Sequence, residues 1–157
     1  MSIPNCSQEI YNIQVSSSGS ADNNNYVINF NTSLKDVVRA ALVTASVPCS
    51  TSNIVYISVD QLRSKFNDFS NAAAGTLTTA TSSTLRNVFG VVYNDDHEVK
   101  NRITYYNRYP IVAEFPYPIQ RLDRLNIKLY NNNGILLQDE GENYFTFRFI
   151  CNRKNLC

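Results

Sequence analysis

The sequence holds one histidine, His97, within the polar run Asp95-Asp96-His97-Glu98. Imidazole is the side chain best suited to acid–base catalysis near neutral pH, so any Ser/His/Asp or Cys/His arrangement in this chain depends on His97. Asp96 and His97 could bind a metal ion weakly, but a transition-metal site usually needs three or four converging ligands. The run is more typical of a solvated surface turn. We therefore expect neither a catalytic residue nor a metal site, and the chain is not predicted to be an enzyme.

A second acidic run, Asp139-Glu140-Gly141-Glu142, offers oxygen ligands of the kind that calcium prefers. It lacks the DxDxDG spacing of a calcium-binding loop, and a hairpin loop before the last predicted strand explains it better. The chain also has no GxGxxG motif and no GxxxxGK(S/T) phosphate-binding loop. We therefore expect no cofactor and no small-molecule substrate.

Tyrosines gather in the run Tyr105-Tyr106-Asn107-Arg108-Tyr109. Exposed rings of this kind could stack on sugar rings, so one hypothesis is a lectin-like, carbohydrate-binding β-sandwich. Tyrosine is also common in strands as an amphipathic residue, with a buried ring and a solvated hydroxyl. The chain has no tryptophan, the residue on which sugar rings most often stack. The strand interpretation is favoured, and carbohydrate binding is kept as the alternative function.

The charge of the chain is close to balanced, with a net charge of +1 at pH 7 and a pI of about 7.6. A near-neutral chain lacks the electrostatic footprint of a nucleic-acid binder. The densest basic group, Arg121, Arg124 and Lys128, is interrupted by Asp123. A local basic patch is the alternative, but ordinary solvated charge explains the group, and no nucleic-acid partner is expected.

The four cysteines, Cys6, Cys49, Cys151 and Cys157, form no CxxC pair, so neither zinc nor a redox motif is indicated. We expect free thiols, as in a reducing compartment. The N-terminal residues contain no cationic leader with an apolar run, and no stretch approaches the roughly 18–20 apolar residues of a membrane span. These features predict cytosol-like surroundings and no membrane span.

Alternating apolar and polar residues predict a series of short strands separated by asparagine-rich turns. The apolar residues of each strand share one face, as do Phe145, Phe147 and Phe149 in the last strand. In the strand before it, Leu125, Ile127 and Leu129 are predicted to face inward. The predicted strands cover residues 10–15, 26–30, 37–48, 54–59, 88–93, 103–106, 111–115, 125–130 and 144–151.

The longest predicted strand covers residues 37–48, and simple alternation assigns its two faces. The inward side is predicted to be Val37, Ala41, Val43, Ala45 and Val47, and the opposite side Val38, Ala40, Leu42, Thr44 and Ser46. Arg39, near the start, is expected to reach solvent or a carboxylate at the rim of the sheet. Residues 61–69 are the best helix candidate, and the small-residue tract within about 70–84 is predicted to be a mobile loop.

One-sided strands must bury their apolar faces against a second sheet, or close on themselves. Two packed antiparallel sheets or a barrel satisfy the pattern, whereas a parallel α/β fold does not, because its crossover helices are missing. A chain of 157 residues is most economically one domain with its own core. The residues therefore predict an all-β domain that works by assembling with other proteins.

Two blocks of the sequence, taken together, resemble a known family. The first block is Tyr26-Val-Ile-Asn-Phe30, then Val38-Arg-Ala-Ala-Leu-Val-Thr-Ala-Ser-Val-Pro48, then Asn53-Ile54. The second is Phe115-Pro-Tyr-Pro-Ile-Gln-Arg-Leu-Asp-Arg-Leu-Asn-Ile-Lys-Leu-Tyr-Asn-Asn-Asn-Gly134, followed by Phe145-Thr-Phe-Arg-Phe149. In order and spacing they are similar to the penton, or vertex, minor capsid protein of virophages and related large DNA viruses. The likeness runs from about residue 11 to 149, with Cys49 and the small-residue tract as departures.

The resemblance implies a single jelly roll over residues 1–157, with eight strands in two four-stranded antiparallel sheets and short flexible tails at both ends. It implies a structural protein without catalytic, cofactor-binding or metal-binding residues. Five copies would form a homopentamer that closes a fivefold vertex of an icosahedral capsid and contacts the double-jelly-roll major capsid protein. The expected location is the virion, with assembly in the host-cell cytoplasm.

Overall fold

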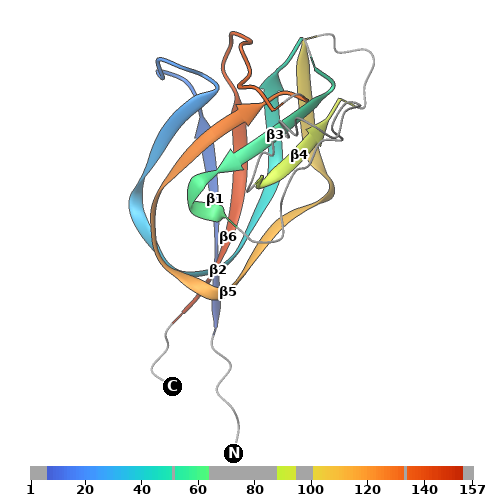
Figure 1. The fold of residues 1–157 in the computed structure, drawn as a ribbon. Coiled ribbons are helices and arrows are strands. Elements are labelled where there is room, and N and C mark those ends of the chain that lie inside the picture. The colour runs from blue at the N-terminus through green and yellow to red at the C-terminus, as the bar shows by residue number, and fades with distance from the viewer. Residues whose placement is uncertain (1–6, 51, 64–87, 95–100, 133, 154–157) are drawn as a thin grey trace, which may run out of the picture.

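The computed structural model describes residues 7–50, 52–63, 88–94, 101–132 and 134–153. The regular elements in these ranges are six strands and one short 3-10 turn (Figure 1). Their order along the chain is β1 (Gln8–Ser16), β2 (Asn25–Pro48), β3 (Ile54–Val59), the turn η1 (Asp60–Leu62), β4 (Gly90–Tyr93), β5 (Arg102–Tyr130) and β6 (Tyr144–Asn152). The prediction of an all-β chain is confirmed.

The six strands form one antiparallel sheet in the order β1-β6-β2-β5-β3-β4. The described start of the predicted helix over 61–69 is not α-helical, because the 3-10 turn η1 ends at Leu62 and Arg63 is extended, with a ψ of 128°; the remainder from residue 64 lies outside the described residues. The predicted loop within about 70–84 also lies outside them.

The two long strands, β2 and β5, join segments that the sequence predicts as separate strands. Residues 26–30 and 37–48 are continuous in β2, and residues 103–106, 111–115 and 125–130 are continuous in β5. The two strands pair with each other over most of their lengths, and register shifts absorb the intervening residues. The prolines of β5, Pro110, Pro116 and Pro118, are tolerated because none of them pairs in the ladder with β2, and among the described residues this part of β5 pairs with no other strand.

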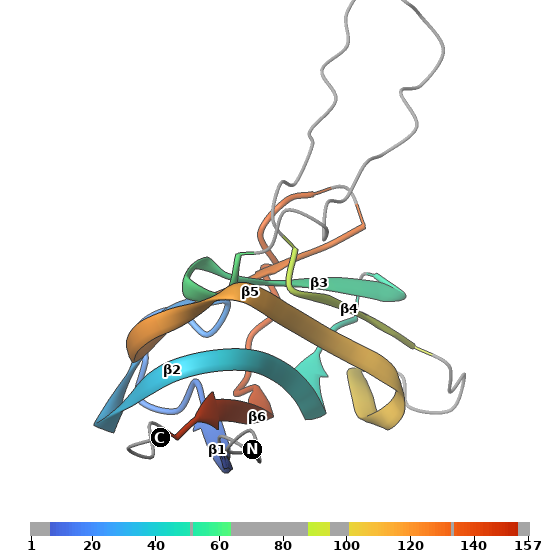
Figure 2. The ribbon, with the colours of Figure 1, turned by 90° about the horizontal axis from the view of Figure 1, so that it is seen from below.

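Each long strand changes its neighbours along its length, so the sheet has two halves. The β1–β6 half consists of β1, β6, residues 37–48 of β2 and residues 102–114 of β5. The β3–β4 half consists of β3, β4, residues 119–130 of β5 and residues 25–36 of β2. Figure 2 shows β2 and β5 curving from one half into the other.

The bend brings the inner faces of the two halves together around one hydrophobic core. Phe89, directly before β4, packs against Phe147 of β6 with ring centroids 5.7 Å apart. Phe30 of β2 meets Phe149 in an edge-to-face contact at 6.0 Å. The inward positions predicted for two strands are confirmed, since all are buried: Leu125, Ile127, Leu129, Phe145, Phe147 and Phe149.

The prediction for the faces of residues 37–48 is wrong in the middle of the segment. Simple alternation places Ala41 and Val43 inward, but the buried residues are Val37, Ala40, Leu42, Ala45 and Val47. Val38 and Val43 have no partner in the ladders with β5 and β6, and the register shifts at both positions. Each one-residue bulge reverses the alternation, so two bulges invert the segment between them and restore it afterwards.

β4 lies unusually close to the first part of β5. A Cβ atom on Gly90 would overlap Cγ2 of Ile111, so only glycine fits at the start of β4. The hydroxyl of Tyr109 donates to the carbonyl oxygen of Val91 at 3.0 Å, which links the same two strands. This contact closes the core where the two halves of the sheet meet.

Candidate interaction surface

Of the candidate chemical residues, those of the acidic run 139–142 lie within the described part of the chain. The run from Asp95 to Glu98, with His97, lies outside the described residues. In the acidic loop, Asp139 accepts a hydrogen bond from Oγ of Ser50 at 2.8 Å, and Glu142 accepts one from the hydroxyl of Tyr144 at 2.6 Å. Across the described ranges, no three His, Cys, Asp or Glu side chains converge as metal ligands would.

The tyrosine run does not form a stacking platform. Tyr105 is buried, its hydroxyl donates to the carbonyl oxygen of Tyr109, and the two rings lie 5.0 Å apart. Burial raises the pKa of the Tyr105 phenol. Asn107 adopts a left-handed backbone with a φ of 46°, which turns the chain between the two tyrosines. Only Tyr106 of the three points outward, at 63% exposure.

A buried polar network fixes the loops at the end of the molecule opposite the termini. Ser17 and Asn143 are both fully buried. The amide nitrogen of Asn143 donates to Oγ of Ser17, and the hydroxyl of Tyr26 donates to Oδ1 of Asn143. Nδ2 of Asn143 donates to the carbonyl oxygen of Asn23. These bonds hold the 17–24 loop against the 139–143 loop, and nothing in the sequence pattern distinguishes these residues from ordinary turn residues.

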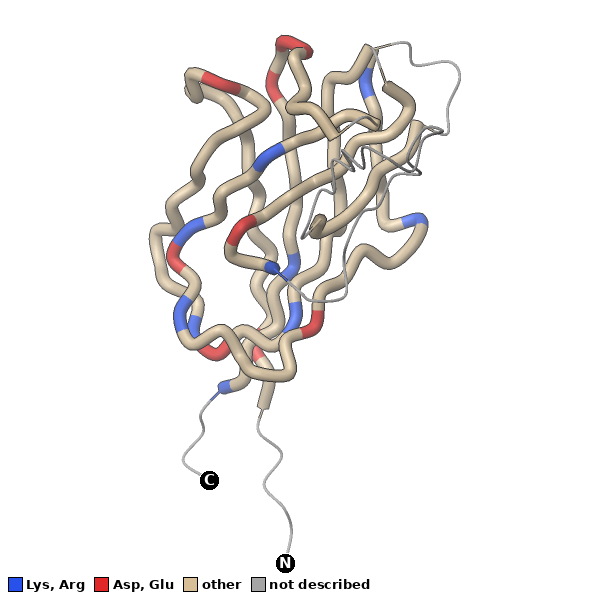
Figure 3. Tube along the Cα trace, in the orientation of Figure 1, with Lys and Arg blue, Asp and Glu red and all other residues tan. Residues whose placement is uncertain are grey.

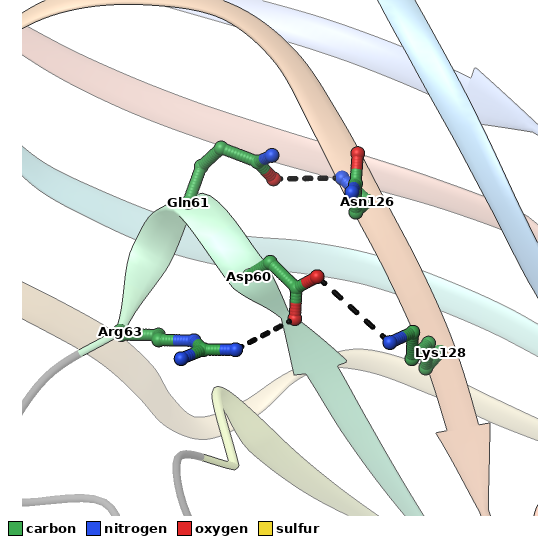
Figure 4. A network of polar contacts seen from close by, with 5 residues as sticks. All are labelled: Asp60, Gln61, Arg63, Asn126 and Lys128. Carbon is green, nitrogen blue, oxygen red and sulfur yellow. Dashed lines mark hydrogen bonds and ion pairs between the residues drawn. The ribbon is translucent and has the colours of Figure 1, made fainter.

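A second polar group ties the short turn η1 to β5 (Figure 4). Asp60 pairs with Arg63 at 3.4 Å and with Lys128 at 3.9 Å. Oε1 of Gln61 accepts a hydrogen bond from the backbone nitrogen of Asn126 at 2.7 Å. These contacts explain why this outward face of β5 is polar, and they give η1 a structural role.

The basic residues singled out in the sequence do not act together. Arg121 pairs with Asp123 at 2.9 Å, whereas Lys128 is held by Asp60. Asp123 also accepts a hydrogen bond from Ser33, and these two bonds lower the pKa of its carboxyl. Figure 3 shows basic and acidic residues interspersed along β2 and β5. The charges in this region are largely compensated locally.

The outward face of the β1–β6 half is the most unusual surface of the described residues. An outward sheet face is normally polar. Here the register aligns Ile10, Ile150 and Arg39 across three strands, and Asn12, Arg148 and Ala41 in the next row. Two depressions on this face share Arg39 and Ile150, and we call them together the groove. The apolar residues lining it are Ile10, Val38, Ala41, Leu42, Pro110, Ile111, Val112, Phe115, Pro116 and Ile150.

The groove carries two exposed arginines in different settings. Arg39 pairs with Glu114, with its Nε 3.8 Å from Oε1 of the carboxylate. A carboxylate partner is one of the two surroundings expected for Arg39 from the sequence, the other being solvent. Arg148 donates from Nε to Oδ1 of Asn12 at 3.1 Å. No carboxylate of the described residues pairs with Arg148, so its positive charge is not compensated within this part of the chain.

The groove borders an open edge of the sheet at β1. Among the described residues, β1 pairs only with β6, through nine consecutive residues without a bulge. Natural edge strands are usually protected by lysine, proline, a bulge or short length. The segment from Gln8 to Ser16 has none of these four features; it carries one charged residue, Glu9, and it exposes 62% of Ile10. The opposite edge strand, β4, has only four residues, and so short a strand offers little backbone for pairing with another chain.

The two cysteines in the described ranges are buried thiols. Cys49 donates a hydrogen bond to the carbonyl oxygen of Ser52, and burial raises the pKa of Cys151. Cys6 and Cys157 lie outside the described residues. No helix of the described residues is long and apolar enough to cross a membrane.

No known protein family matches the chain, and a comparison with curated proteins gives no match either. The function of the chain is therefore inferred from three features: the strand pairing, the groove, and the resemblance of its sequence to vertex capsid proteins.

Proposed function

We propose that the chain is a structural capsid protein that forms homopentamers and closes the fivefold vertices of an icosahedral virus capsid. The two sequence blocks that resemble the vertex capsid proteins lie on β2, β5 and β6. The protein has no catalytic role in this proposal, and its partners are further copies of itself and a double-jelly-roll major capsid protein.

The observation that carries the proposal is the order of strand pairing. Counting the two parts of β2 and β5 separately gives four segments in the β1–β6 half and four in the β3–β4 half. Two four-stranded antiparallel layers joined in this way are the arrangement of a single jelly roll, a fold common among viral capsid proteins. The contact of Phe89 with Phe147 supports the packing of one layer on the other.

The outward face of the β1–β6 half gives independent support for an assembling protein. It combines an apolar groove with a long, regular edge strand that carries a single charged residue, and both features favour contact with a partner. A contact between two different patches, repeated from copy to copy, closes into a ring when the rotation is right. A fivefold ring therefore needs only one such contact for each subunit.

Jelly rolls also occur in lectins, so carbohydrate binding has to be weighed against assembly. The residues that suggested a sugar platform, Tyr105 and Tyr109, are packed against each other and bonded to backbone carbonyls. The tyrosine run therefore gives no support to the lectin hypothesis, and the capsid proposal is the one that we pursue.

The test is the mass and symmetry of the purified protein. Five copies of 17.8 kDa give a species of about 89 kDa, which light scattering should detect at high protein concentration. Electron microscopy of that species should show fivefold rings. Dissociation on dilution is compatible with the proposal, because neighbouring capsomers also hold a vertex. A specific twofold dimer contradicts it, as does a monomer at every concentration that fails to bind the major capsid protein.

A further inference from the structure

The groove on the β1–β6 half has the chemistry of a binding site for an acidic, apolar segment. Most of its lining side chains are apolar, and the side chain of Arg148 lies among Ile10, Ala41 and Ile150. Covering these apolar side chains is favourable, but covering an arginine without a counter-charge is costly. An occupant that carries both apolar side chains and a carboxylate satisfies both conditions.

One segment of this same chain has that composition. The loop between β5 and β6 exposes 59% of Ile135, and it carries Glu140 on its surface. Glu140 makes no hydrogen bond or ion pair with any described residue. The carboxylate of Glu140 is therefore available to a cationic partner.

The neighbours of Glu140 hold this loop in a fixed shape. Asp139 accepts bonds from the backbone nitrogen and Oγ of Ser50. The carbonyl oxygen of Glu142 accepts a bond from Arg102 at 2.9 Å, and Asn143 is anchored in the buried network. A loop that is already ordered loses little conformational entropy when it binds, which favours its use as a docking element.

Glu140 and Arg148 do not pair within one chain. The loop lies at the end of the molecule opposite the termini, where Figure 3 shows acidic residues gathered. β6 begins at Tyr144 and runs away from it. Four residues of extended strand separate Tyr144 from Arg148, a distance of roughly 13 Å. The complementary charges can therefore meet between two copies, through two different patches.

We propose that the groove of one copy receives the loop of residues 135–142 of a second copy, with Glu140 paired to Arg148. The inference rests on the proposed ring, and it names the contact that builds the ring. Each subunit presents one loop and one groove, so the contact is heterologous and can repeat until the ring closes. The loop and the groove lie toward opposite ends of the strands, so neighbouring copies are arranged head to tail.

A charge-exchange experiment tests the contact. Arg148→Glu and Glu140→Arg each place like charges opposite one another, and each should raise the concentration for half-assembly by about tenfold or more. The double variant restores opposite charges and should assemble close to the wild-type concentration. Arg124→Glu is the matched control, because it reverses an exposed arginine outside the groove, and it should assemble as the wild type does.

The outcomes separate the inference from the proposed function. Thermal unfolding verifies that each variant is folded, as expected for exposed side chains. A wild-type protein that never forms a pentamer contradicts both the proposed function and this contact. A wild-type pentamer that survives Arg148→Glu overturns the contact alone. A double variant that assembles no better than the single variants also overturns it.

Discussion

Phe147 of β6 packs against Phe89, the residue before β4, with ring centroids 5.7 Å apart, although three strands lie between β6 and β4 in the sheet. Neighbours across a flat sheet of this size would be far apart, because adjacent strands are about 4.8 Å from each other. The contact therefore shows that β2 and β5 bend the sheet strongly enough to bring its two halves face to face. It also makes Phe147 the residue on which both halves of the core depend.

Phe147→Ala should lower the free energy of unfolding by about 3–5 kcal/mol, because it leaves a cavity at a fully buried site. Lys128→Ala is the control on an outward strand face, and its effect should stay within about 1 kcal/mol, the upper range for a partly exposed ion pair. Denaturant midpoints of the two variants measure the difference. Equal midpoints would show that the inward face of β6 is assigned wrongly.

Gly90→Ala should destabilise the protein by about 1–3 kcal/mol, because the added methyl group overlaps the side chain of Ile111. The same change in an Ile111→Ala background should cost much less, since the overlapping atom has been removed. A double-mutant cycle based on urea unfolding isolates this coupling. Additive effects would mean that β4 does not approach β5 as closely as the structure describes.

Tyr26 should make the stability of the protein sensitive to alkaline pH. Burial raises the pKa of its phenol above the ordinary value of 10.0, so the unfolded chain loses this proton first as the pH rises. The linkage relation then gives a loss of up to about 1.4 kcal/mol per pH unit above pH 10 from this group, and none below it. Tyr26→Phe should flatten the alkaline limb in a comparison of unfolding free energies at pH 9 to 11. An unchanged slope would contradict the prediction.

Ile10→Lys should weaken assembly without weakening the fold, because Ile10 is exposed on β1 beside the groove. A lysine there protects the open edge and removes apolar surface. Val27→Lys is the control, since Val27 is half-exposed on β2 in the other half of the sheet. Light scattering should find fewer pentamers for Ile10→Lys only. Equal loss in both variants would assign the contact to another surface.

Cys49 and Cys151 should resist alkylation in the folded protein and react quickly in denaturant. Both are buried, and burial raises the pKa of the Cys151 thiol, so little of the reactive thiolate forms near neutral pH. Mass spectrometry after timed labelling with iodoacetamide gives the rates. Rapid labelling of either residue under native conditions would contradict this burial.

The strands were predictable from the sequence where apolar and β-branched residues are concentrated, as in residues 54–59, and where alternation is strict, as in the three phenylalanines of β6. Alternation failed at Val38 and Val43, because a bulge has no signature in residue type when the surrounding residues are all small or aliphatic. The continuity of β2 and β5 was also hidden, since it depends on long-range pairing. The one-sided pattern was compatible with two packed sheets or a barrel, whereas the six strands are hydrogen-bonded into one bent sheet.

The candidate surface was less predictable than the fold. Arg148 and Ile150 were visible only as residues on one side of the last strand, and Glu140 only as part of an acidic loop. The place of Arg148 and Ile150 in the groove depends on the registers of β1, β6 and β2. These registers align the apolar residues of three strands around one arginine. No local pattern in the sequence contains that information.

The position of β6 between β1 and β2 has a consequence for biosynthesis. Gln8 pairs with Asn152, so the first strand has its described partner only after nearly the whole chain has left the ribosome. Until then Ile10 has neither Ile150 nor Arg148 beside it, and the groove does not exist on a nascent chain. A chain that has been translated only as far as β5 would therefore be unable to accept a neighbour through this groove, and entry into the proposed ring would have to wait for β6.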